Sequence, residues 1–255
     1  MTGLTGKAAL ITGAGGGVGR AAAQLLAARG ACLAITDRDT ASLATTETLV
    51  RSAGGSVIAH VADLNVPQDI ERFATLAAQK LGGIDVICNV AGILGEGSIE
   101  SATREDFDRI MHINCFAQLM LIQKALPALR RSNRASIVNV ASVGALLALP
   151  LMTMYCASKA AVLGMTRAVA AELAPNIRCN AICPGGIDSP MSQALLAQFS
   201  PQEREALLPK LIGRQLMKRF ASPEEIATLI AFLASDESSF LTGAVLPIDG
   251  GQTAW

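Results

Sequence analysis

Apolar residues fall along the chain in short runs that alternate with long segments rich in alanine and leucine. The short runs have the length and the β-branched content of buried strands, whereas the long segments have the length of helices. The expected strands are residues 7–12, 32–36, 56–61, 85–90, 136–141, 177–182 and 244–248. The expected helices are residues 17–29, 40–53, 67–81, 103–130, 155–173 and 223–234.

Strands that alternate with helices are typical of a parallel sheet that is covered on both faces. Residues 188–220 fit this alternation less well, and we expect them to form a substrate-lid insertion with one or two short helices. The next helix has a clear start, because Ser222 can cap it and Glu225 follows at its third position. No linker or repeat divides the chain. We therefore predict one doubly wound α/β domain over residues 1–255, with a seven-stranded parallel sheet and helices on both faces.

Composition narrows the class of protein. Hydrophobic residues make up 51% of the chain and charged residues 16%, which argues against disorder. Lys plus Arg equals Asp plus Glu, at 21 each, so no basic field points to nucleic acid. Residues 1–13 do not read as a signal peptide, and the apolar run 144–152 is too short to span a membrane. We expect a cytoplasmic protein without a nucleic-acid or membrane partner.

The cysteines and histidines do not indicate a metal site. The six cysteines include no CxxC pair, and no Cys/His cluster has metal-ligand spacing. Most of the cysteines sit in apolar runs, which favours buried, reduced side chains. His60 and His112 have no partner pattern either and are interpreted as structural or surface residues.

A glycine-rich segment, ITGAGGGVGR, follows the first expected strand and opens a helix. Parallel α/β sheets bind ligands at the carboxyl ends of their strands, and a helix N-terminus there offers amides and a positive dipole. Glycines let the backbone come close to a diphosphate. The alternative, a plain glycine-rich turn, fits this strand–turn–helix context less well. The candidate diphosphate-binding residues are Gly13, Gly16, Gly17, Val18 and Gly19.

The second expected strand leads into Asp37, where a dinucleotide fold places an acid against the adenosine ribose. A carboxylate there would repel a 2′-phosphate, and the loop residues Gly15 and Gly16 offer no cation to attract one. Arg38 is the opposing indication, because it could turn toward a phosphate. NAD is therefore favoured over NADP. Asp37 could also serve as a turn residue before the next helix, which is compatible with binding.

Tyr155, the only tyrosine, lies four residues before Lys159, so both would share one face of a helix. A free tyrosine has a pKa near 10 and is a poor base at neutral pH. A nearby ammonium would lower the pKa of Tyr155, and an oxidised nicotinamide would add positive charge. The hydroxyl could then exchange a proton with an alcohol or a carbonyl. Alternatively, the tyrosine packs its ring and the lysine faces solvent.

The chain resembles the classical short-chain dehydrogenase/reductase family over its whole length. TGAGGGVG (12–19) is similar to the family's TGxxxGxG, and YCASK (155–159) to its YxxxK. Ser142 lies thirteen residues before the tyrosine, where the family's serine falls, and MHINCF supplies Asn114. CPGGIDSPM and LPIDGG are similar to the family's PG segment and closing strand. The resemblance implies a Rossmann-type fold and a homotetramer.

The resemblance also implies catalytic roles. Tyr155 would be the acid/base, and Lys159 would lower its pKa and hold the nicotinamide ribose. Ser142 would hydrogen-bond the substrate oxygen, so Ser142 and Tyr155 are the expected substrate-binding residues. Asn114 would hold a water in a proton relay to Lys159.

Further residues would contact the cofactor if the resemblance holds. Asp63 would contact the adenine beside Leu64, and Ile187 and Ser189 would hold the carboxamide. Additional lining residues would be Asn89, Ala91, Gly92, Pro184 and Gly185. Val90 departs from the family, which commonly has asparagine there. We expect this change to alter a hydrogen bond within the sheet without abolishing activity.

The leading hypothesis is an NAD-dependent secondary-alcohol dehydrogenase or ketone reductase. One alternative is an NADPH-dependent 3-oxoacyl-thioester reductase, and another, from a different class, is a non-catalytic nucleotide-binding regulatory protein. The substrate walls are expected after Gly92, at 143–152 and at 188–217. Residues 143–154 carry no charge and the insertion is rich in leucine, with Lys210 and Arg214 as its nearby cations. These walls favour an uncharged, mainly apolar substrate, cyclic or aryl-alkyl rather than a sugar or hydroxy acid.

Overall fold

A seven-stranded sheet runs through the centre of the computed structural model, which describes residues 3–95 and 99–254. All of its neighbouring strands pair in parallel, in the order β3-β2-β1-β4-β5-β6-β7. The strands are β1 (Ala8–Thr12), β2 (Cys32–Asp37), β3 (Ser56–Val61), β4 (Val86–Asn89), β5 (Ala135–Val140), β6 (Ile177–Pro184) and β7 (Val245–Ile248). The chain reverses its direction of winding between β1 and β4, so the expected doubly wound parallel fold is confirmed.

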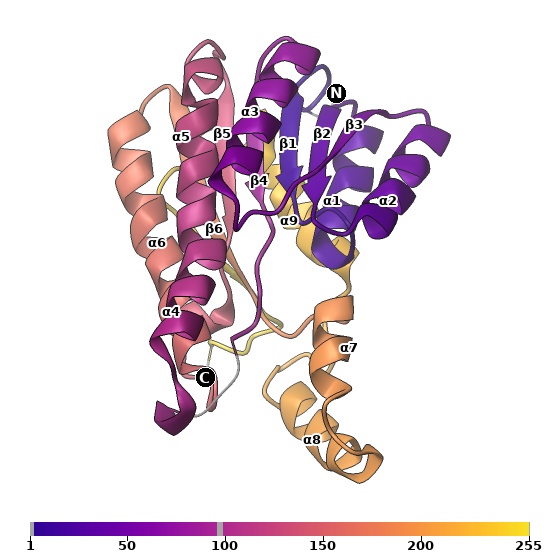
Figure 1. Ribbon diagram of the computed structural model, residues 1–255, viewed down its shortest axis with the longest axis vertical. Helices are drawn as coiled ribbons and strands as arrows, with labels where there is room; N and C mark the ends of the chain where they lie inside the picture. Colours follow the sequence, from indigo (N-terminus) through magenta and orange to yellow (C-terminus); the bar gives the residue numbers. More distant parts are fainter. Residues whose placement is uncertain (1–2, 96–98, 255) are drawn as a thin grey trace.

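Helices cover both faces of this sheet (Figure 1). One face packs against α1 (Gly17–Ala28), α2 (Thr40–Ser52) and α9 (Pro223–Ala234). The other packs against α3 (Pro67–Leu81), α5 (Ala117–Leu129) and α6 (Thr153–Leu173). Short 3-10 turns lie at η1 (Ile99–Ser101), η3 (Val143–Ala145) and η4 (Asp236–Ser238).

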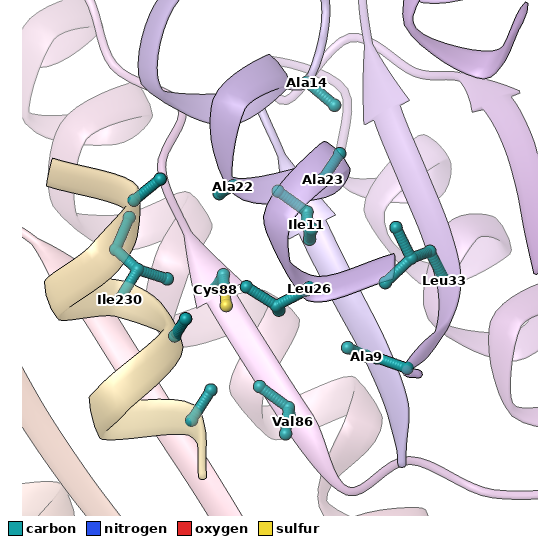
Figure 2. Close-up of a cluster of buried hydrophobic side chains, with 14 of the residues drawn as sticks. Ala9, Ile11, Ala14, Ala22, Ala23, Leu26, Leu33, Val86, Cys88 and Ile230 are labelled. Atoms are coloured by element: carbon teal, nitrogen blue, oxygen red, sulfur yellow. The ribbon is translucent and has the colours of Figure 1, made fainter. Parts of the chain in front are cut away.

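The core between the sheet and the pair α1–α9 is built largely from alanine and branched aliphatic residues. Figure 2 shows Leu26 of α1 and Ile230 of α9 on either side of the strand that carries Val86 and Cys88. These four side chains are fully buried. Burying a leucine or isoleucine stabilises the fold by about 1.5–3 kcal/mol. The small side chains of α1, such as Ala22, let this helix approach the sheet closely and so fix the loop that precedes it.

The prediction of one uninterrupted helix over residues 103–130 is wrong in one respect, because a π-helical segment interrupts the α-helix. The structure has α4 (Arg104–Met111), a π-helical segment η2 (His112–Phe116) and then α5. Asn114 lies in η2, and its side chain bonds the backbone of Ile93 rather than its own helix. Apolar periodicity could not reveal this segment, because a single wide turn keeps the helix direction and leaves the flanking pattern helical.

The insertion forms α7 (Pro190–Leu196) and α8 (Pro201–Gly213), which lie beyond the carboxyl ends of the strands in Figure 1. Its two ends meet where Ile187 pairs with Ala221. Neither helix has a buried residue, so their apolar side chains contribute little to the core. The start of α9 is as expected, because Ser222 and Glu225 form a reciprocal capping box.

Candidate active site

The glycine loop between β1 and α1 has the shape that a close ligand requires. Gly13 has a φ of +68°, and a Cβ there would lie 2.8 Å from the Cα of Ala91. A Cβ at Gly19 would lie 2.6 Å from the carbonyl carbon of Gly13. Only glycine fits either position. No side chain caps the start of α1, so its first amides remain available to an anion. These features fit a dinucleotide diphosphate.

Asp37 ends β2 beside this loop, and its carboxylate is held in place. Its Oδ2 accepts a hydrogen bond of 2.9 Å from the amide of Gly15, and its Oδ1 accepts one of 3.0 Å from Asp39. Asp37 and Arg38 both line a cavity of about 320 Å³ at the carboxyl ends of the strands. The cavity therefore has an acid and a cation next to each other where β2 ends.

The loops after β3 and β4 form the next part of the cavity. Asp63 and Leu64 line it, and the Leu64 carbonyl lies 3.2 Å from Nε2 of His112. The amides of Val90 and Ala91 both donate to Oγ1 of Thr12, at 3.1 Å each. These two bonds join the ends of β1 and β4 without any side-chain amide at position 90.

Asn89 does not lie where we expected. Its side chain is buried inside the sheet, where Nδ2 donates to Oδ1 of Asn139 at 2.9 Å. Asn139 in turn donates to Thr166 of α6 at 2.9 Å. Neither Asn89 nor Gly185 lines the cavity. A Cβ at Gly185 would lie 2.8 Å from the Cα of Asp249, so this glycine permits packing against the turn after β7.

Asn114 connects the π-helical segment to the loop after β4. Its Oδ1 accepts from the Ile93 amide at 2.8 Å, and its Nδ2 donates to the Ile93 carbonyl at 2.9 Å. Nδ2 also donates to Ser158 of α6 at 2.9 Å. Asn114 is fully buried, while its partner Ile93 lines the cavity. The Asn114 side chain therefore fixes one wall of the cavity, and the water relay implied by the resemblance stays a prediction.

Tyr155 and Lys159 lie in the first two turns of α6 and both line the cavity. The Lys159 ammonium lies 5.8 Å from the centre of the Tyr155 ring and donates to the Val140 carbonyl at 3.0 Å. Ser142, at the start of η3, is nearly buried, and its hydroxyl accepts from the Gly144 amide at 3.1 Å. Ser142 is absent from the cavity lining, but its hydroxyl lies near enough to Tyr155 to affect the pKa of that side chain.

Burial controls the ionisation of this pair. It raises the pKa of Tyr155, an effect that a hydrogen bond from Ser142 only partly opposes. Burial also lowers the pKa of Lys159 to about 8, against smaller opposite effects of Cys115 and Cys183. We expected Lys159 to lower the tyrosine pKa, but in this structure desolvation of the phenolate dominates and raises it, and Ser142 rather than Lys159 is the group that opposes the shift.

The segment after β6 closes the cavity on its remaining side. Pro184, Ile187 and Ser189 line it, as the sequence predicts. A Cβ at Gly17 would lie 3.5 Å from Ser189, so this segment crosses directly beside the glycine loop. Within the expected substrate walls, Ile93, Ser189, Pro190 and Met191 line the cavity and residues 143–152 do not. Residues 96–98 of the wall expected after Gly92 lie outside the described residues.

The structure brings most of the expected cofactor residues into one cavity. These are Gly13, Gly16, Gly17, Val18, Gly19, Asp37, Arg38, Asp63, Leu64, Ala91, Gly92, Tyr155, Lys159, Pro184, Ile187 and Ser189. Sequence reasoning missed further lining residues, namely Thr36, Ala62, Val90, Ile113, Val140 and Ala141. Several of these directly end or follow a strand, and that position is a signal that could have found them.

Two other features of the described residues bear on the kind of protein. Within residues 3–95 and 99–254, no group of three or more His, Cys, Asp or Glu residues is arranged to hold a metal ion. In the same residues, no helix is long and apolar enough to cross a membrane.

Burial raises the pKa of the Cys88 and Cys179 thiols to about 12, so both are inert at neutral pH.

Comparisons with known proteins agree with this geometry. A family model described as enoyl-(acyl carrier protein) reductase matches residues 13–253. Among curated relatives from Thermotoga maritima, an uncharacterized oxidoreductase is 40% identical over 98% of both chains. The 3-oxoacyl-acyl-carrier-protein reductase FabG of that organism is 39% identical over 97% of this chain and 98% of its own.

A solved structure shows the same likeness in three dimensions. The crystal structure of levodione reductase matches with a TM-score of 0.94 at 36% identity and covers 98% of both chains. A levodione reductase of Leifsonia aquatica is likewise 36% identical, over 99% of this chain and 96% of its own. With its parallel sheet and its glycine loop, the chain belongs to the classical short-chain dehydrogenase/reductase family of oxidoreductases.

Proposed function

We propose that the protein transfers a hydride between NAD(H) and an uncharged, mainly apolar secondary alcohol or ketone. One observation carries the proposal: Tyr155 and Lys159 line the same cavity as the glycine loop and Asp37. The glycine loop would hold the diphosphate, Asp37 the adenosine ribose, and Lys159 the nicotinamide ribose. When bound, the nicotinamide supplies the hydride acceptor or donor.

In this proposal the side chains of the protein handle the proton. Tyr155 takes the proton from the alcohol oxygen in oxidation and returns one in reduction. Ser142 bonds the same oxygen and holds it beside the tyrosine hydroxyl. Lys159 is fixed by its bond to the Val140 carbonyl, so its ammonium stays over the tyrosine ring. The positive charge of an oxidised nicotinamide would offset the burial that raises the pKa of Tyr155.

The first prediction concerns the choice of cofactor. We expect wild-type protein to prefer NAD(H) over NADP(H) by about tenfold or more in kcat/KM, a difference of about 1.4 kcal/mol. The reason is that the Asp37 carboxylate lines the cavity and would repel a 2′-phosphate. Asp37→Asn should narrow this preference, as measured from initial rates with both cofactors.

A matched control lies two residues away. Asp39→Asn removes an equal charge from a side chain that caps α2 and does not line the cavity, and asparagine caps as well as aspartate. The cofactor preference of this variant should equal that of the wild type. A wild-type preference for NADP(H) would show instead that Arg38 dominates this end of the cavity.

The second prediction concerns the substrate. Large apolar side chains are exposed on the expected walls, namely Leu146, Leu151, Met191, Leu208, Leu216 and Met217, and of these Met191 lines the cavity. A pocket of such residues gains about 25 cal/mol for each Å² of apolar surface that it buries, and it penalises an unpaired charge. We expect a higher kcat/KM for a cyclic or aryl secondary alcohol than for a polyol or a hydroxy acid. A clear advantage for the polyol or the acid would contradict this assignment.

A second candidate function is NADPH-dependent reduction of a 3-oxoacyl thioester. It is favoured by the 39% identity to the 3-oxoacyl-acyl-carrier-protein reductase of Thermotoga maritima. The name of the levodione reductase, which is similar to this chain over 98% of its length, instead supports ketone reduction. Rates with a 3-oxoacyl thioester and NADPH, compared with rates for an apolar ketone and NADH, separate the two functions.

A further inference from the structure

Arg20, on the first turn of α1, lies against the back of the glycine loop. Its Nη2 donates to the Gly15 carbonyl and, at 3.2 Å, to the Ser42 carbonyl. Its Nε donates to Oγ1 of Thr46 at 2.9 Å. One guanidinium therefore joins α1, the glycine loop and α2. Arg20 does not line the cavity, so it would not touch the cofactor.

Thr46 extends this connection to the peptide that precedes Gly15. It is fully buried, and its hydroxyl donates to the Ala14 carbonyl at 2.7 Å. A second acceptor, the Ser42 carbonyl, is farther away at 3.3 Å. Because Arg20 donates to the threonine oxygen, the single hydroxyl proton is free to point at Ala14.

The Ala14 carbonyl and the Gly15 amide belong to one peptide group. This amide donates to Oδ2 of Asp37 at 2.9 Å, on the opposite side of the peptide from Thr46. A continuous chain of hydrogen bonds thus runs from Arg20 through Thr46 and the peptide to the Asp37 carboxylate. Hydrogen bonds in such a chain polarise and strengthen one another.

The backbone of Gly15 in the glycine loop lies very close to the carboxylate of Asp37. A Cβ at Gly15 would lie 2.8 Å from Oδ2 of Asp37, so this backbone approaches the carboxylate as closely as glycine allows. The other carboxylate oxygen accepts from Asp39. Any shift of the Ala14–Gly15 peptide would therefore turn or release the carboxylate.

We propose that Arg20 and Thr46 are positioning residues for cofactor selection. They hold the Ala14–Gly15 peptide in the orientation that aims the Asp37 carboxylate at the adenosine ribose hydroxyls. The inference rests on the proposed function, because it assumes that Asp37 selects NAD(H). It assigns part of that selection to two residues that lie behind the loop, on α1 and α2.

The test compares Thr46→Val, which keeps the shape of the side chain and removes the hydroxyl, with Thr46→Ser, which keeps the hydroxyl. Dissociation constants for NADH and NADPH are measured by fluorescence titration, together with KM and kcat for both cofactors. We expect Thr46→Val to narrow the NADH preference about fivefold, the factor that one neutral hydrogen bond is typically worth. The change should appear in KM and leave kcat within about twofold. Thr46→Ser should restore the preference.

Thr45→Val is the matched control. Thr45 is exposed on the same helix, and its hydroxyl bonds only the Ala41 carbonyl of that helix. It should keep the wild-type preference. If Thr46→Val does not fold, Arg20→Lys replaces it, because lysine keeps the charge but cannot donate to all three oxygens in this geometry. The same narrowing is then expected.

The outcomes separate the inference from the function on which it rests. A wild-type preference for NADPH overturns the proposed NAD dependence and the inference together. A wild-type preference for NADH that survives in the folded Thr46→Val or Arg20→Lys variant overturns the inference alone. An equal loss of affinity for both cofactors also overturns it, because a merely structural role would weaken both.

Discussion

Replacement of Tyr155 by phenylalanine is expected to lower kcat by about a hundredfold to ten-thousandfold, the range that positioned acid–base catalysis supplies. The substitution removes one hydroxyl from a side chain that is only 9% exposed and keeps the ring. The ring edge still packs against Gly144, where a Cβ would lie 3.4 Å from Cε1 of Tyr155. The fold should therefore survive, while the group that exchanges the proton with the substrate is lost.

NADH binding should survive this substitution, because the glycine loop, Asp37 and Lys159 remain. Fluorescence titration with NADH measures the binding, and initial rates at saturating cofactor measure kcat. Cys156→Ala provides a neighbouring control, since the side chain of Cys156 does not line the cavity. Near-wild-type turnover in the phenylalanine variant would be incompatible with Tyr155 as the acid/base.

The sequence predicts the fold well because the apolar pattern is strong. Each strand of the interior of the sheet is a short apolar run, and β1, β4 and β5 are buried at every position. The sequence of a fully buried strand does not alternate between polar and apolar residues, so the strand is recognised by the length of its apolar run and by the turn that follows it. The glycine loop and Asp37 were predictable for a related reason, since ligand sites of parallel sheets lie where strands end.

The features that the sequence did not predict depend on directions and distances. The pattern placed Asn89 at the end of a strand, but only the structure shows that its amide turns inward to Asn139. The π-helical turn that holds Asn114 has no periodic signature. Arg20 and Thr46 lie 26 positions apart, and nothing in the spacing indicates that they meet. The pKa direction of Tyr155 depends on burial, which a motif does not measure.

Substitution of Lys159 is expected to change the activity of the protein much more than its stability. Its side chain is 3% exposed, and burial lowers its pKa from 10.5 to about 8. Between these two pH values Lys159 binds more protons in the unfolded chain than in the folded one, so its own contribution to stability should rise with pH across that window. Buried thiols such as Cys88 and Cys179, whose pKa is raised, contribute in the opposite direction. Below pH 8 the full cost of burying the ammonium is present. The decrease from 10.5 to about 8 corresponds to about 3 kcal/mol.

Lys159→Met should therefore lose activity without a matching loss of stability. Methionine fills a similar volume without a charge and removes the cost of burying the ammonium at pH 7. It also leaves the Val140 carbonyl without its donor, which costs about 1–3 kcal/mol. The two effects nearly cancel, so the free energy of unfolding at pH 7 should change by less than about 2 kcal/mol. Between pH 8 and 10.5 the free energy of unfolding of the wild type should therefore rise relative to that of this variant, because only the wild type contains the Lys159 ammonium.

The activity of the same variant should fall in both kinetic parameters. Without the ammonium, the cavity loses the cation beside the Tyr155 ring and the group that would hold the nicotinamide ribose. We expect kcat to fall by about a hundredfold or more, because the proton exchange at Tyr155 is no longer supported. The KM for NADH should rise as well. Denaturant unfolding at pH 7 and pH 10, with kinetics on the same samples, measures both. A large destabilisation that parallels the loss of activity would mean that Lys159 acts through the fold rather than through the cofactor and Tyr155.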